Sequence, residues 1–67
     1  MNTLVAKRDV IGFCLSDAEG YELIIDLKAG SRIKVWNVLD VYEDEITVNM
    51  FGPDDEYIVS TEDFEIE

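Results

Sequence analysis

The chain has 67 residues with 16 acidic and five basic side chains, no histidine and one cysteine. This length predicts a single domain spanning residues 1–67, which buries only about 60% of the surface that the unfolded chain exposes. The formal net charge of −11 argues against direct binding to nucleic acid or to anionic membranes, because their phosphates would repel the chain.

The composition excludes the disulfides and metal sites that often stabilise a small domain. One cysteine cannot form an intrachain disulfide, and a chain without histidine or clustered cysteines offers no zinc site. We therefore expect no metal and no cofactor. A lone thiol is typical of a reducing compartment, and no apolar run approaches the roughly 18 residues of a membrane span. The sequence predicts a cytoplasmic protein.

The first predicted strands lie in the N-terminal half. Residues 10–15 are almost uniformly apolar, which predicts a strand buried on both faces, with Cys14 as a small core residue. In residues 21–27 apolar and polar positions alternate, so we expect Tyr21, Leu23, Ile25 and Leu27 to face the core.

The later segments repeat this period of two. Alternation predicts strands over residues 32–36, 46–50, 57–59 and 64–66, with turns at 16–20, 28–31 and 52–55. Ser60 is placed to cap a short 3₁₀ turn before the last strand. Five or six short strands with frequent turns and no helical stripe predict an all-β fold, a small antiparallel barrel or sandwich.

Three stretches resemble the small SH3-like and Sm-like barrels. They are "DLKAGSRIKV", "VWNVLDVYEDEITV" and "EYIVSTEDFEI". The resemblance covers residues 10–67 and implies a barrel with a short 3₁₀ turn before its final strand. The Asp/Asn RNA-binding loops of Sm proteins are missing, so no RNA binding is implied. The first stretch also resembles the Rof family of acidic Sm-like inhibitors, which block the RNA site of a termination factor.

The sequence offers no catalytic residues, and we expect no enzyme. Histidine, the usual general base, is absent, and no glycine-rich phosphate loop occurs. The acidic runs 43–45 and 54–56 lack the alternating ligand spacing of a calcium loop, which makes them more typical of solvated hairpin tips.

Trp36, the only tryptophan, has three interpretations. If Ile33 and Val35 face the core, strand parity places Arg32, Lys34 and Trp36 on the opposite face. Such a face is typical of an interface anchor, and also of a platform that stacks single-stranded nucleic acid. Alternatively, the strand bends and Trp36 folds back into the core. We expect partial exposure and a role in an interface.

Charge is the strongest functional signal. Residues 1–34 contain five bases and five acids, whereas residues 35–67 contain eleven acids and no base. On the last strand Asp63, Glu65 and Glu67 alternate at roughly 6.5–7 Å, about twice the ~3.4 Å axial rise per phosphate on one DNA strand. Acidic rows of this kind can imitate a phosphate backbone.

The sequence thus predicts a non-enzymatic binding protein, an inhibitor or modulator of the phage or mobile-element type. Its acidic half would dock on the basic, nucleic-acid-binding surface of a host protein. Alternatives are a module that self-associates through strand edges and Trp36, a single-stranded nucleic-acid binder, and a surface whose acids only solvate the chain. The predicted partner-binding residues are Trp36, Asp40, Glu43, Asp44, Glu45, Asp54, Asp55, Glu56, Glu62, Asp63, Glu65 and Glu67.

Overall fold

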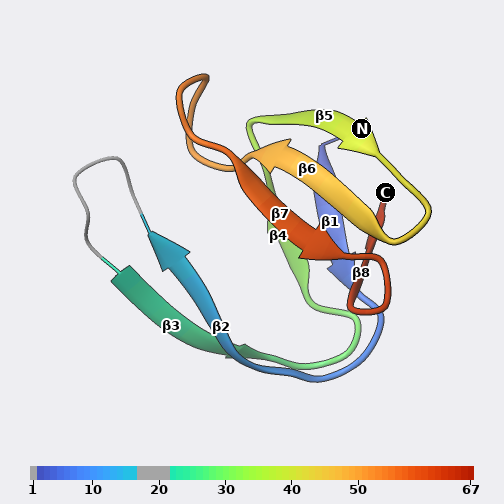
Figure 1. Ribbon diagram of the computed structural model, residues 1–67. Helices are drawn as coiled ribbons and strands as arrows, with labels where there is room; N and C mark the ends of the chain where they lie inside the picture. The colour runs from blue at the N-terminus through green and yellow to red at the C-terminus, as the bar shows by residue number, and fades with distance from the viewer. Residues whose placement is uncertain (1, 17–21) are drawn as a thin grey trace.

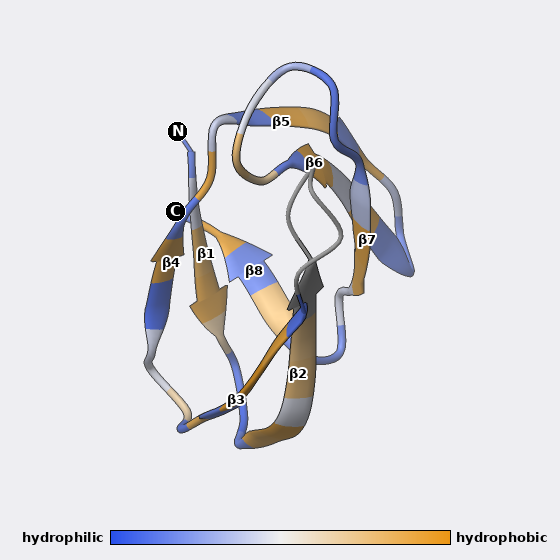
Figure 2. Cartoon of the chain, turned by 90° about the vertical axis from the view of Figure 1, so that its left-hand side faces the viewer, coloured by the Kyte–Doolittle hydropathy of each residue, from blue (hydrophilic) through white to orange (hydrophobic). Residues whose placement is uncertain are grey.

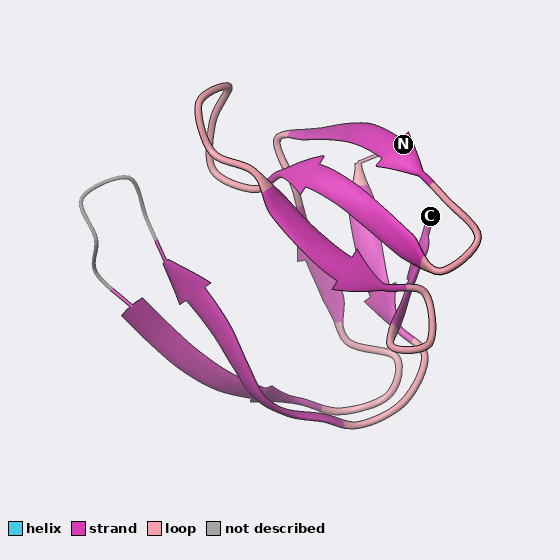
Figure 3. Ribbon diagram, viewed as in Figure 1, coloured by secondary structure: helices cyan, strands magenta, loops and turns pink. Residues whose placement is uncertain are grey.

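The computed structural model describes residues 2–16 and 22–67, and all of its regular structure there is β-strand (Figure 3). The strands are β1 (Thr3–Ala6), β2 (Val10–Ser16), β3 (Glu22–Leu27), β4 (Arg32–Lys34), β5 (Asn37–Val41), β6 (Glu45–Asn49), β7 (Tyr57–Ser60) and β8 (Phe64–Ile66). All of the strand pairs are antiparallel. The predicted all-β class is confirmed.

The strands form three small sheets, in the orders β4-β1-β8, β2-β3 and β5-β6-β7 (Figure 1). Within the described residues none of these sheets closes into a barrel, and there are eight strands where the sequence predicted five or six. One extra strand is β1, whose four residues are too few to show a period. Another is β5, because the predicted strand 32–36 ends at Lys34. The Trp36 amide instead donates to the carbonyls of Asn49 and Met50, and β5 begins at the next residue in a different sheet.

The core lies between the two three-stranded sheets, which Figure 2 shows as separate layers. Strand β6 is central in its sheet, and its residues Ile46 to Asn49 are all buried. The predicted inward faces of the segments around residues 33–35, 46–50 and 64–66 are confirmed. The buried apolar residues are Leu4, Ala6, Val35, Ile46, Val48, Met50, Val59 and Phe64.

The hairpin β2–β3 projects from this body (Figure 1). Phe13 packs against Phe64 with ring centroids 5.2 Å apart, and Ile25 and Leu27 also pack against the core, as predicted. Elsewhere on the hairpin the predictions are wrong. Ile11, at its base beside the irregularity in register between Val10 and Phe13, is 77% exposed, and Cys14, which was expected in the core, is exposed.

Leu23 is also exposed, although alternation predicts it on the core face. The reason is that a two-stranded hairpin has no third strand or second layer, among the described residues, to cover its outer half. Tyr21 and positions 17–20 of the first predicted turn lie outside the described residues.

Two predicted turns are confirmed in detail. Gly30 adopts a φ of 90°, a conformation that glycine takes without steric cost, and its amide donates to the Ala6 carbonyl. Before β8, the Asp63 amide donates to the Ser60 carbonyl at 3.1 Å, and the Glu62 amide donates to Ser60 Oγ at 3.1 Å. Ser60 therefore caps the turn, which is a single hydrogen-bonded turn rather than a 3₁₀ helix.

Candidate protein-interaction surface

Cations of the N-terminal half meet the last strand through the sheet β4-β1-β8. The Arg8 guanidinium lies 2.6 Å from Asp63 and 3.8 Å from Glu62. On the far side of β1, Arg32 forms an ion pair with Glu67. The sequence separates these charges by more than 30 residues, and the strand order places them together.

This pairing changes the meaning of the predicted carboxylate row. Phe64 and Ile66 pack in or against the core and Glu65 between them is exposed, whereas Asp63 lies in the turn before β8 and Glu67 follows the strand. However, the two outer members are paired with Arg8 and Arg32. Only Glu65 has no ion-pair partner among the described residues, so the row presents little uncompensated charge.

The sheet β5-β6-β7 shows the opposite balance. Residues 37–60, which comprise its strands and connecting loops, contain seven acids and no base. No ion pair to any of these acids occurs within residues 2–16 and 22–67. The charge asymmetry of the sequence is thus spatial: arginines pair with Asp63 and Glu67 beside β8, whereas no ion pair reaches the acids of β5-β6-β7 within the described residues. The seven acids are Asp40, Glu43, Asp44, Glu45, Asp54, Asp55 and Glu56.

The two acidic tips, residues 43–45 and 54–56, are among the predicted partner-binding residues and lie at opposite ends of this sheet (Figure 1). The tip at 43–45 ends in Glu45, the first residue of β6, and residues 50–53 separate the end of β6 at Asn49 from the tip at 54–56. At ~3.3 Å per residue, β6 alone places its two ends about 13 Å apart. A partner that touches both tips must therefore span the sheet.

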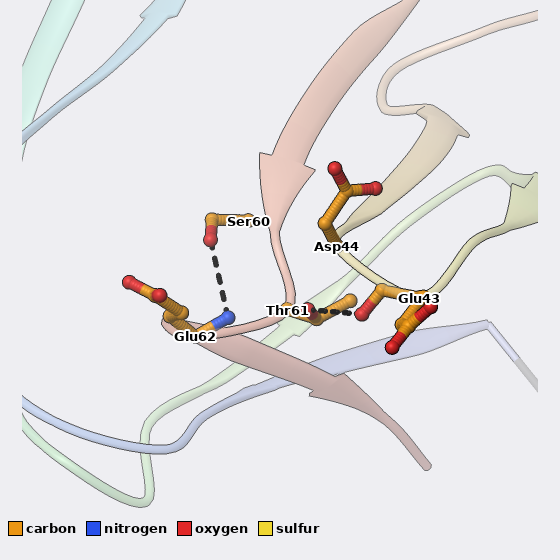
Figure 4. Close-up of a pocket in the computed structure, with 5 residues that line it drawn as sticks. All are labelled: Glu43, Asp44, Ser60, Thr61 and Glu62. Carbon is orange, nitrogen blue, oxygen red and sulfur yellow. Dashed lines mark hydrogen bonds between the residues drawn. The ribbon is translucent and has the colours of Figure 1, made fainter.

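At the first tip, an open depression of about 620 Å³ lies between the β5–β6 turn and the turn before β8 (Figure 4). Thr61 joins the two turns, because its Oγ1 donates to the Glu43 carbonyl at 2.8 Å and its amide to the Asp44 carbonyl at 3.2 Å. The carboxylates of Glu43, Asp44 and Glu62 point away from one another. Consistently, no group of three potential metal ligands forms among the described residues.

Two cations border this depression. Lys7 Nζ donates to the Thr61 carbonyl at 2.9 Å, and Arg8 reaches Glu62. Their charge opposes that of Glu43 and Asp44, so the potential at this end is less negative than its carboxylates alone would make it.

At the second tip, Asp55 is part of the loop scaffold. Its carboxylate accepts from the amides of Met50 at 2.5 Å, Phe51 at 2.8 Å and Gly52 at 3.0 Å. Its carbonyl accepts from Asn49 Nδ2 at 2.5 Å. The neighbours, Asp54 and Glu56, are exposed. The sequence does not distinguish these three acids. In the structure the Asp55 carboxylate holds the loop, whereas Asp54 and Glu56 face solvent.

Trp36 lies at the corner between β4 and β5 and is 53% exposed, which confirms the predicted exposure and excludes a core position. The Lys34 side chain is also exposed, but Arg32 is engaged with Glu67. The predicted base-plus-aromatic face therefore retains one unpaired base among the described residues.

Phe51 is a surface aromatic that the sequence reasoning missed. It is 54% exposed and packs edge-on against Tyr57, with centroids 6.0 Å apart. The signal was present: an aromatic residue directly before Gly52 and Pro53 lies in a turn, where few core positions exist.

No family model, curated protein or solved structure matches the chain. In the part of the chain that the structure describes, no helix has the length and apolar character needed to cross a bilayer. Function must therefore be argued from the surface itself, since a fold alone does not imply one.

Proposed function

We propose that the chain is a non-enzymatic acidic binding protein that docks the sheet β5-β6-β7 and its loops on a basic surface of a nucleic-acid-binding host protein. The observation that supports this is the segregation of charge: seven acids and no base in residues 37–60, beside a sheet where arginines pair with Asp63 and Glu67. The docked chain acts as an inhibitor or modulator, because it occupies positions that phosphates would otherwise take.

Two electrostatic arguments support a functional role for the negative charge of this sheet. A small domain needs a net charge of only about 2–8 for solubility, and like charges on one sheet destabilise the compact state. The seven acids are spread over a single sheet, and no ion pair to any of them occurs within the described residues. A complementary basic surface would relieve their repulsion and would speed association.

The likeness to small SH3-like and Sm-like barrels, including the acidic Rof-type inhibitors, belongs to this proposal. Antiparallel strands, the bent hairpin of β5 and β6 and the capped turn before β8 support it. A phage or mobile-element origin is part of the same proposal, since inhibitors of host nucleic-acid enzymes are often small and acidic.

Charge reversal tests the proposal with variants of equal charge change. The test variants are Glu43→Lys with Asp44→Lys, and Asp54→Lys with Glu56→Lys. The matched control reverses Glu22 and Glu65, which lie on other sheets. Asp55 is left intact because its carboxylate holds the loop. Each tagged variant is used to capture proteins from a bacterial lysate, which are then identified by mass spectrometry.

We expect the unmodified chain and the control to capture a basic nucleic-acid-binding protein, and at least one test variant to lose it. The complex should also weaken between about 0.1 M and about 1 M salt, over which the Debye length falls from about 10 to about 3 Å. Equal capture by all variants would show that the acids serve only to solvate the chain.

A second candidate, self-association, is favoured by the projecting hairpin. Ile11, Leu23 and Ile24 are exposed on it, and each of its strands has an edge that pairs with no other strand in the described residues (Figure 2). Sedimentation equilibrium distinguishes the two candidates, because an apolar homodimer persists or strengthens at high salt, whereas the charge-driven complex dissociates.

A further inference from the structure

Two half-exposed aromatic residues, Trp36 and Phe51, lie on neighbouring main-chain segments where β4 turns into β5. The Trp36 amide donates to the Asn49 carbonyl at 2.9 Å and to the Met50 carbonyl at 3.1 Å, which places Trp36 beside the residue that precedes Phe51. Both side chains remain more than half exposed. Large exposed aromatics gathered at one place are typical of binding surfaces, because Trp in particular is enriched among the residues that dominate interface energy. We call Trp36, Phe51, Asp54 and Glu56 the aromatic corner.

The main chain of the aromatic corner is held firmly. Asp55 accepts three amides of the loop, one of them from Phe51 itself, and Asn49 Nδ2 donates to the Asp55 carbonyl. The Phe51 ring rests edge-on against Tyr57. A surface that is already ordered loses little conformational entropy on binding. Less of the free energy gained from its contacts is therefore spent on ordering, and the affinity is higher.

Charge distinguishes this corner from the other end of the sheet. Asp54 and Glu56 flank Asp55 and are exposed, and no ion pair to either occurs within the described residues. At the other end, Lys7 and Arg8 lie beside the acids. The aromatic corner therefore combines apolar rings with uncompensated negative charge, a combination that complements a cation with a flat or apolar body.

We infer that the aromatic corner is the contact point of the partner and that it takes an arginine side chain from a basic protein segment. The guanidinium lies against the indole of Trp36 or the ring of Phe51 and pairs with the carboxylates of Asp54 and Glu56. Arginine fits better than lysine, because its planar group stacks on aromatic rings and bonds carboxylates through two N–H groups at once. This inference rests on the proposed function and deepens it by naming one end of the sheet and one side-chain chemistry.

The fluorescence of Trp36 provides a local readout, since it is the only tryptophan. The probe is a synthetic peptide of alternating arginine and glycine, with a lysine–glycine peptide of equal length for comparison, and binding is measured in parallel by calorimetry. We expect the arginine peptide to change Trp36 fluorescence saturably and to bind more tightly than the lysine peptide.

Isosteric variants locate the contact without reversing charge. Asp54→Asn with Glu56→Gln should weaken arginine-peptide binding roughly three- to tenfold, the effect expected for two exposed ion pairs. The matched control, Glu43→Gln with Asp44→Asn, should stay within about twofold, the scale of the long-range field alone. Phe51→Ala should weaken binding about two- to fivefold through the lost ring contact. Lys34→Ala should leave binding equal or tighter, because it removes a competing cation.

The outcomes separate this inference from the proposed function. If a basic lysate protein is captured but the arginine peptide neither changes Trp36 fluorescence nor distinguishes the two isosteric pairs, the inference is overturned and the proposed function stands. If the peptide behaves as expected but no basic protein is captured, the proposed function fails and the chemistry of the corner stands. A single-stranded oligonucleotide that changes Trp36 fluorescence at lower concentration than the peptide, and that needs Lys34, would overturn the inference in favour of base stacking.

Discussion

The Arg8 guanidinium and the Asp63 carboxylate form an ion pair with an N–O distance of 2.6 Å, across 55 positions of sequence. The pair is possible because β1 and β8 are neighbours, with Ala6 opposite Phe64. Together with the pair of Arg32 and Glu67, it uses the arginines of the first half on acids of the last strand. Among the described residues, most of the acids without an ion pair lie on β5-β6-β7, and these acids are the basis of the proposed docking surface.

This ion pair should contribute little to stability. The Arg8 side chain is 59% exposed and that of Asp63 27%, so solvent screens their attraction. We expect Arg8→Ala to reduce the free energy of unfolding by at most about 1 kcal/mol, measured by urea denaturation, and the reduction to shrink at high salt. A loss well beyond this, insensitive to salt, would mean that Arg8 packs rather than pairs.

Asp55 should matter more than its acidic neighbours. Asp55→Ala removes the acceptor of three amides, and hydrogen bonds to a charged group contribute about 1.5–3 kcal/mol each at most. We expect a loss of about 2–3 kcal/mol in urea denaturation, because water replaces part of the lost bonding at this half-buried site. Asp54→Ala, the control, should change stability by no more than about 0.5 kcal/mol. Equal effects at the two positions would contradict the assigned role of Asp55.

Sequence patterns predicted which residues form the core better than they predicted which apolar residues lie exposed. The period of two placed Val35, Ile46, Val48 and Phe64 inward, since each of these positions has a second layer to pack against. The same pattern failed at Leu23, because alternation shows which side chains share a face and does not show whether anything covers that face.

The sequence predicted that the candidate surface is rich in acids, but it did not predict which acids lie together or which are paired with arginines. The excess of acids in the second half can be counted from the sequence, whereas their partition depends on which strands are neighbours. Arg32 reaches Glu67 only because β4 and β8 flank β1. Similarly, adjacent Asp54 and Asp55 are equivalent in the sequence, and only the conformation of the loop gives one of them three amide donors.

Truncation of two phenylalanines should destabilise the protein to very different degrees. Phe64 is 1% exposed and packs against Phe13, so Phe64→Ala should cost about 3–5 kcal/mol and leave much of the small domain unfolded by circular dichroism. Phe51→Ala removes a half-exposed ring and one edge-on contact, which predicts a loss of about 1 kcal/mol. Comparable losses for both variants would contradict the placement of Phe51 on the surface.

Cys14 should react readily with thiol reagents in the folded protein. The residue is exposed on the outer part of the hairpin, where no second layer protects it among the described residues. We expect a chromogenic disulfide reagent to modify the thiol at the same rate with and without denaturant, within a few-fold. Strong protection that disappears in denaturant would show that the hairpin is covered, as it would be in a self-associated form.

The most direct test of the docking proposal is competition for the partner. The basic protein captured from the lysate is first bound to a fluorescently labelled oligonucleotide, and the chain is then titrated in while the anisotropy of the label is followed. We predict that the anisotropy falls to that of free oligonucleotide, and that the variant with Asp54→Lys and Glu56→Lys displaces it only at much higher concentration. An anisotropy that holds or rises as the chain binds would show that chain and nucleic acid occupy different sites, which would contradict the account.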